Sequence, residues 1–195
     1  EQQEEASHTL VTEEMKQLGI ENPYTDDKCY VYGWIPATPG YEQIPALGFI
    51  AHMDTAPDCS GEKVRPMIWE NYDGGEIRLK NDRVLSPEMF TELPALKGRT
   101  LITSEGTTLL GADDKAGIAE ILTMAEKMIR EQIPHGRICI AFTPDEEIAR
   151  GPDNFDVPAF GADFAYTLDG ECGDGIAYEN FNAATVNISI KGVLA

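Results

Sequence analysis

The chain has 195 residues, of which 42% are hydrophobic and 25% are charged. That is enough to bury the core of about one domain, and it excludes a disordered tail or a collagen-like rod. Acidic residues outnumber basic ones 34 to 15, so the formal net charge is −19, and such a surface repels the phosphates of nucleic acids and of anionic lipids. We therefore expect neither nucleic acid nor a membrane as a partner, and the sequence leaves the oligomeric state open.

The chain start and the cysteines indicate a compartment. Residues 1–5 have neither the basic nor the apolar stretch of a signal peptide, and no apolar run approaches the roughly 20 residues of a membrane span. The four cysteines lie far apart without a CxxC pair, which favours reduced thiols over a disulfide framework. We expect a cytoplasmic protein. Position 1 is not Met, and a strand-like run over 184–193 stands at the end, so we also expect a fragment of a longer protein.

Helical and strand patterns alternate along the chain, which predicts an α/β fold. The excursion between residues 57 and 108 is rich in turn-forming residues and carries short strand-like pieces, so we interpret it as hairpins within one domain. The continuous apolar runs predict strands buried on both faces of a largely parallel or mixed sheet that helices sandwich. In chain order we predict a helix over 10–18, strands over 29–35 and 47–51, the excursion, a helix over 114–132, and strands over 137–143 and 164–168.

Three of these strands are each followed by acidic or histidine side chains. His52 and Asp54 follow the first, Glu146 and Glu147 the second, and Asp169 the third. In an open α/β sheet, ligands bind outside the carboxyl ends of the strands, so these side chains are expected to share one site. The helix that begins near Asp113 and Asp114 adds two further carboxylates.

Carboxylates crowded into one crevice repel each other, and a cation is the usual remedy. One imidazole with several carboxylates suits zinc, with cobalt or manganese as substitutes. His52 and Asp54 would share a strand face, so one could bind metal while the other orients it. Of Glu146 and Glu147, one could bind metal and the other serve as general base. Taken singly, each has an ordinary alternative as a surface, turn or helix-start residue, and their recurrence at successive strand ends favours a site.

Four ordered motifs then carry a resemblance. The chain resembles the M20 family of zinc metallopeptidases, and within it the tripeptide aminopeptidases. Shorter stretches over 155–164 and 179–183 extend the resemblance over nearly the whole chain. The motifs are HMDTAPD (52–58), LGADDKAG (110–117), PDEEI (144–148) and YTLDGE (166–171).

The resemblance implies a role for each candidate residue. His52 and Asp169 would bind one zinc, Asp113 would bridge two zincs, and Glu147 would bind the second. Asp54 would hold the His52 ring, and Glu146 would be the general base. A cis peptide bond is implied between Asp113 and the following aspartate.

The implied activity is removal of the N-terminal residue from tripeptides, with water activated by metal attacking the peptide carbonyl. The alternatives are another hydrolase of this family, a dipeptidase or an N-acyl-amino-acid deacylase, or a non-catalytic metal-binding module. The resemblance implies that residues 1–183 are the first part of a catalytic domain and that 184–195 form a strand leading to a lid domain. The lid and a last metal-binding histidine would lie outside this chain, so the chain alone is expected to be inactive.

Overall fold

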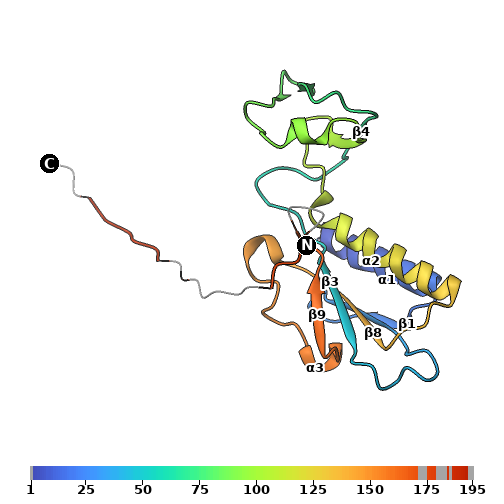
Figure 1. The fold of residues 1–195 in the computed structure, drawn as a ribbon. Helices are drawn as coiled ribbons and strands as arrows, with labels where there is room; N and C mark the ends of the chain where they lie inside the picture. The colour runs from blue at the N-terminus through green and yellow to red at the C-terminus, as the bar shows by residue number, and fades with distance from the viewer. Residues whose placement is uncertain (1, 171–174, 179–183, 185, 193–195) are drawn as a thin grey trace.

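A computed structural model describes residues 2–170, 175–178, 184 and 186–192, with side chains from Ser7 onward. A layer of two long helices, a sheet and a projecting excursion are visible in Figure 1. In chain order the elements are α1 (Gln2–Leu18), β1 (Glu21–Thr25), β2 (Val31–Ile35), β3 (Leu47–His52), β4 (Pro66–Trp69), β5 (Ile77–Arg78), β6 (Val84–Leu85), the 3-10 helix η1 (Leu93–Leu96), β7 (Leu101–Ser104), α2 (Ala112–Glu131), β8 (Ile138–Thr143), the 3-10 helix η2 (Glu146–Ile148), α3 (Val157–Phe160) and β9 (Phe164–Thr167).

Five strands form the main sheet, in the order β1-β2-β8-β3-β9. Strand β3 runs parallel to β8 and to β9, whereas β2 is antiparallel to both β1 and β8. The sheet is therefore mixed, and the predicted α/β class is confirmed. Strand β1 was not predicted, because its sequence ENPYT contains Asn and Pro, which strands disfavour. All six residues of the central strand β8 are buried, as its apolar sequence predicts.

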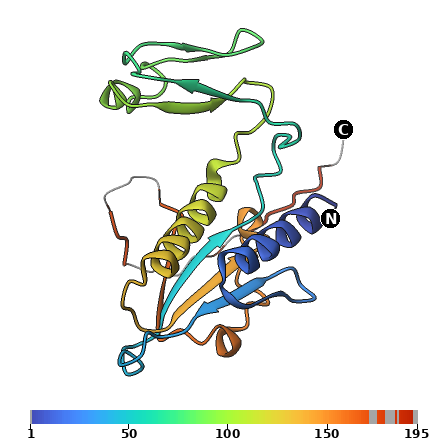
Figure 2. The same cartoon turned by 90° about the vertical axis from the view of Figure 1, so that its right-hand side faces the viewer.

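Both long helices cover the same face of the sheet. Figures 1 and 2 show α1 and α2 side by side against the strands. Their apolar residues, among them Met15 and Ile121, pack with Ile140 and Phe142 of β8 in the larger core. The opposite face is covered by the short helix α3 and the segment around Phe155. They pack on Tyr30, on Tyr32 of β2 and on Cys139 and Ala141 of β8. Helices therefore sandwich the sheet unequally.

Strand β9 departs from the predicted burial. Its four residues are all exposed, including Phe164 and Tyr166 at 50% and 42%. The reason is its place at the edge of the sheet, where β3 is its only partner among the described strands. An apolar sequence predicts the strand, but its position in the sheet decides how much of it is covered.

The excursion folds into a small unit of its own. Strand β4 pairs antiparallel with β7, and β5 with β6, around a small core of Tyr72, Ile77 and Leu93. It projects from the carboxyl-end edge of the main sheet (Figure 2). Residues 179–183, which carry part of the family resemblance, lie outside the described residues. Residues 184 and 186–192, within the predicted final strand, form no strand in the structure because nothing described pairs with them.

Candidate metal centre

The predicted site residues converge at one edge of the sheet. His52 is the last residue of β3 and is in register with Thr143, the last residue of the parallel strand β8. Glu146 and Glu147 follow β8 in η2, and Asp169 lies two residues beyond the end of β9. Because β3, β8 and β9 are mutually parallel, their carboxyl ends meet at the same edge.

The His52 imidazole is the centre of the cluster. Its Nε2 lies 2.8 Å from Oδ1 of Asp113, 3.8 Å from Oε2 of Glu146 and 3.9 Å from Oδ2 of Asp169. The ring side chain is only 2% exposed, although the Asp113 side chain is 71% exposed. The site thus has a buried side at His52 and a solvent-exposed side at Asp113.

Asp54 connects the histidine to the glutamates. Its Oδ1 lies 3.3 Å from Nδ1 of His52, and its two oxygens accept hydrogen bonds from the backbone N–H groups of Glu146 and Glu147 at 3.1 and 3.0 Å. The same-face argument assumed that the strand continues through Asp54, whereas β3 ends at His52. The carboxylate still contacts the ring, but the hydrogen-bond partner of Nδ1 is the backbone carbonyl oxygen of Asp54, at 3.2 Å. Asp54 therefore orients the imidazole mainly through its backbone and η2 through its carboxylate.

Asp114 has a role that sequence reasoning missed. Its side chain is buried, and its oxygens accept hydrogen bonds from the backbone N–H groups of His52 and Gly117, each at 3.2 Å. Asp113 and Asp114 have non-helical backbone angles, so Asp114 acts as the N-cap of the regular helix that follows. The peptide bond between them is cis, as the resemblance implies. An aspartate directly before a helical pattern is the sequence signal for a cap, but it does not predict that the carboxylate is buried.

Local charge in the cluster shifts several pKa values. Burial lowers the pKa of His52, but the hydrogen bond to Asp113 and the charges of Asp54 and Asp169 outweigh it and raise the pKa. The site therefore attracts positive charge to the imidazole.

The acids respond in the direction that crowding predicts. Burial raises the pKa of Asp114 to about 6 despite its two backbone hydrogen bonds. Burial also raises the pKa of Glu146, and the charges of Asp169, Asp54 and Glu147 act in the same direction. A bound cation would stabilise such a cluster of carboxylates, as is typical of metal sites.

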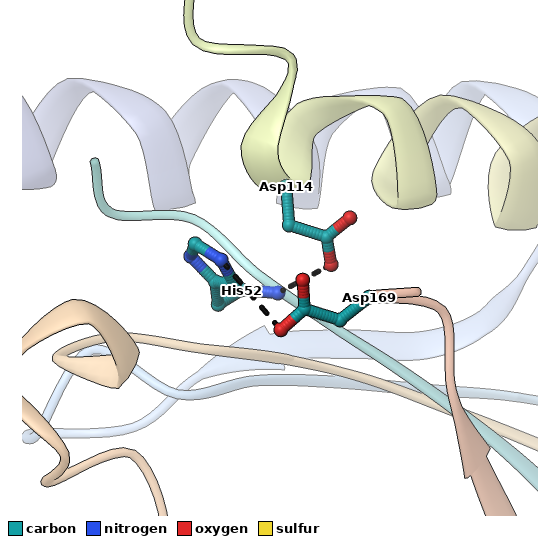
Figure 3. A group of neighbouring side chains, drawn as sticks. All are labelled: His52, Asp114 and Asp169. Atoms are coloured by element: carbon teal, nitrogen blue, oxygen red, sulfur yellow. Dashed lines mark hydrogen bonds and ion pairs between the residues drawn. The ribbon is translucent and has the colours of Figure 1, made fainter. Parts of the chain in front are cut away.

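The ligand atoms are close enough for metal coordination. Two groups each bring their candidate ligand atoms within 4.8 Å of one another: His52 with Asp113 and Glu147, and His52 with Asp114 and Asp169. Figure 3 shows the second group, with both aspartates directed toward His52. Two ligands of a tetrahedral zinc ion lie about 3.3 Å apart when each bond is about 2.0 Å. The oxygens of Asp113 and Asp169 lie 2.8 and 3.9 Å from His52 Nε2, on either side of this value, so these donors fit zinc.

Comparison with known proteins adds an independent finding. No family model matches the chain. The chain is 55% identical over 184 residues to peptidase T of Clostridium perfringens and 51% identical over 186 residues to peptidase T of Bacillus mycoides, in each case over 94% of this chain.

The chain is related to peptidase T. It spans 45% of the length of each of these two peptidase T relatives. A solved structure agrees: the aminopeptidase PepT from Bacillus cereus superposes with a TM-score of 0.62 at 27% identity, over 83% of this chain and 37% of that one. The similarity to peptidase T that the four motifs indicate is confirmed, and so is the fold class, for the part of peptidase T that this chain spans.

Proposed function

We propose that the protein is a zinc-dependent aminopeptidase that removes the N-terminal residue from tripeptides. The observation that carries the proposal is the convergence of one imidazole and several carboxylates at the carboxyl ends of three parallel strands. The names of the relatives, peptidase T and aminopeptidase PepT, support a peptide substrate and cleavage at its N-terminus. The chain spans about half the length of its curated relatives, so the proposal concerns the product of the complete gene.

In this proposal four residues hold two zinc ions. His52 and Asp169 would hold the first ion, Glu147 would hold the second, and Asp113 would be shared by both. Asp113 suits the shared position because its carboxylate contacts His52 Nε2 at 2.8 Å and its ligand atom also lies within 4.8 Å of that of Glu147. Asp54 keeps the His52 ring in position through Nδ1. Cobalt or manganese is a plausible substitute for zinc with this mixed set of nitrogen and oxygen donors.

Glu146 is proposed as the general base. It lies 3.8 Å from His52 Nε2 and belongs to neither group of candidate ligands. Bound zinc supplies a Lewis acid that lowers the pKa of water and polarises a carbonyl. Glu146 accepts the proton from the attacking water, holds it on its carboxylate, and donates it to the nitrogen of the leaving amine. A raised pKa brings this carboxyl closer to the range in which it can do both.

The remaining proposals concern context. We propose that residues 1–183 are the N-terminal part of a catalytic domain and that 184–195 lead to a lid domain. We also propose short peptides as the partners and the cytoplasm as the compartment. Within the described part of the chain, no helix is both long and apolar enough to cross a membrane.

A substrate panel on the product of the complete gene tests the activity. We expect release of the N-terminal residue from tripeptides, its loss on treatment with a zinc chelator, and recovery when zinc is restored. Preference for dipeptides or for N-acyl amino acids would instead identify one of the related hydrolases. Zinc binding without hydrolysis of any of the three classes would show a non-catalytic module, and absence of zinc binding would refute the metal centre itself.

A further inference from the structure

Asp114 carries a buried carboxylate for which the proposed chemistry has no use. The residue is 4% exposed, and burying a charge without partners is costly. Both of its oxygens are engaged by backbone: Oδ2 accepts from the N–H of His52, and Oδ1 accepts from the N–H of Gly117. Figure 3 shows the side chain directed from the start of α2 to the backbone of β3. The carboxylate therefore joins two elements that are 62 residues apart in sequence.

The first turn of α2 is built closely around this carboxylate. A Cβ atom on Gly117 would lie 2.5 Å from Oδ1 of Asp114 and 2.3 Å from the carbonyl oxygen of Leu168. Both contacts are too short for any side chain. Gly117 thus lets α2 approach the end of β9 and lets Asp114 reach the helix backbone.

A second contact fixes the same junction. Nζ of Lys115 donates a hydrogen bond to the backbone carbonyl of Met53 at 3.1 Å. Asp114 and Lys115 therefore hold the backbone of two consecutive residues, His52 and Met53. The backbone of His52 is held directly, and Asp113 directly precedes Asp114. The two hydrogen bonds from α2 to the end of β3 therefore determine how the His52 imidazole and the Asp113 carboxylate face each other.

We propose that Asp114 is a positioning residue of the metal centre: its backbone hydrogen bonds set the separation of the His52 and Asp113 ligand atoms, and it does not bind the metal. This inference rests on the proposed function in treating His52 and Asp113 as ligands. Two backbone N–H donors need two acceptor oxygens, which a carboxylate offers and an amide does not, since its second position is an N–H₂ donor. Asp114→Asn therefore leaves one of the two N–H groups without an acceptor.

Cobalt binding to the 195-residue chain separates a positioning residue from a ligand. Co²⁺ reports its donor set in its visible spectrum, so the spectrum at saturation identifies a changed ligand and the titration gives the affinity. We expect Asp114→Asn to weaken cobalt binding by roughly 10- to 100-fold while the saturated spectrum stays as in the wild type. We expect Asp113→Asn to alter the spectrum itself. Asp27→Asn, which removes one charge from a side chain that is 86% exposed, serves as the control for net charge.

A second variant tests the same geometry without touching any acid. Gly117→Ala places a methyl group against Asp114 Oδ1 and should weaken cobalt binding by roughly tenfold or more, again with an unchanged spectrum. Helix propensity alone favours alanine, so it predicts no such loss. Ala119→Gly, at an exposed position of the same helix, is the matched control for an alanine–glycine exchange and should leave the affinity unchanged.

Amide hydrogen exchange in the metal-free chain provides a readout that needs no metal. The N–H groups of His52 and Gly117 should be protected in the wild type, and protection of one or both should fall in Asp114→Asn, with other amides of β3 and α2 unaffected. A saturated cobalt spectrum altered by Asp114→Asn would overturn the proposal by making Asp114 a ligand. Unchanged affinity or unchanged exchange at both amides would overturn it as well. If the wild type binds no cobalt, the proposed metal centre is refuted. The exchange measurement still tests whether Asp114 accepts hydrogen bonds from the N–H groups of His52 and Gly117.

Discussion

Without bound metal, the chain should lose stability as the pH rises through the range in which Asp114 ionises. Burial holds the pKa of this carboxyl at about 6, against 3.8 for the free side chain. The folded state therefore binds the Asp114 proton more tightly than the unfolded state does. The resulting stabilisation is complete below the unfolded pKa and disappears as the pH rises through about 6. The raised pKa of His52 adds a loss in the same direction at higher pH.

The size of the Asp114 contribution follows from the two pKa values. Their difference corresponds to at most about 3 kcal/mol of unfolding free energy at about 1.4 kcal/mol per pKa unit. About 2 kcal/mol of this should be lost between pH 4.5 and pH 7.5, because at pH 4.5 the unfolded carboxyl is already mostly ionised. These values are upper bounds, because solvent near the open side of the site screens part of the effect.

Urea unfolding in the presence of a chelator measures the effect. Other carboxylates titrate in the same interval, so the readout is the difference between wild type and Asp114→Asn in their change of unfolding free energy from pH 4.5 to pH 7.5. The variant should lack about 2 kcal/mol of that change, whatever its absolute stability, and Asp27→Asn should behave as the wild type. Equal pH dependence in wild type and Asp114→Asn would refute the reasoning.

Three further predictions concern the site and the sheet. In the product of the complete gene, Glu146→Gln should lower kcat for tripeptides by roughly 10² to 10⁴ with zinc content near normal. Glu147→Gln should instead lose zinc from the second site, as measured by elemental analysis. The reverse pattern would exchange the roles of the two glutamates. Elemental analysis of the 195-residue chain after mild dialysis should find about one tightly held zinc or fewer, because only one site has three of the proposed ligands. Two equally tight zinc ions would mean that another residue completes the second site. Gly48→Ala places a Cβ 2.6 Å from the Phe160 ring and 2.8 Å from the Ala165 Cβ. Thermal unfolding should therefore show a loss of about 1–3 kcal/mol in unfolding free energy. An unchanged melting temperature would show that α3 can shift without loss of stability.

Local sequence patterns were sufficient for the elements that position the site. The apolar runs that became β3, β8 and β9 and the amphipathic pattern of α2 each lie within a few residues of their predicted bounds. The polar residues that follow the strands could be grouped without coordinates, because parallel strands present their carboxyl ends at one edge. His52, Glu146 and Asp169 meet there as this rule requires.

Tertiary structure decided the features that depend on distant neighbours. The exposure of β9 follows from its place at the sheet edge, and the antiparallel strands β1 and β2 make the sheet mixed. Neither property can be predicted from the residues of the strand itself. Asp114 shows the same limit at the site. Its sequence context predicts a helix start, but its burial depends on the backbone of His52, 62 residues away. Periodicity reports which face of an element is apolar, whereas burial of a charged group is determined by what the fold brings against it.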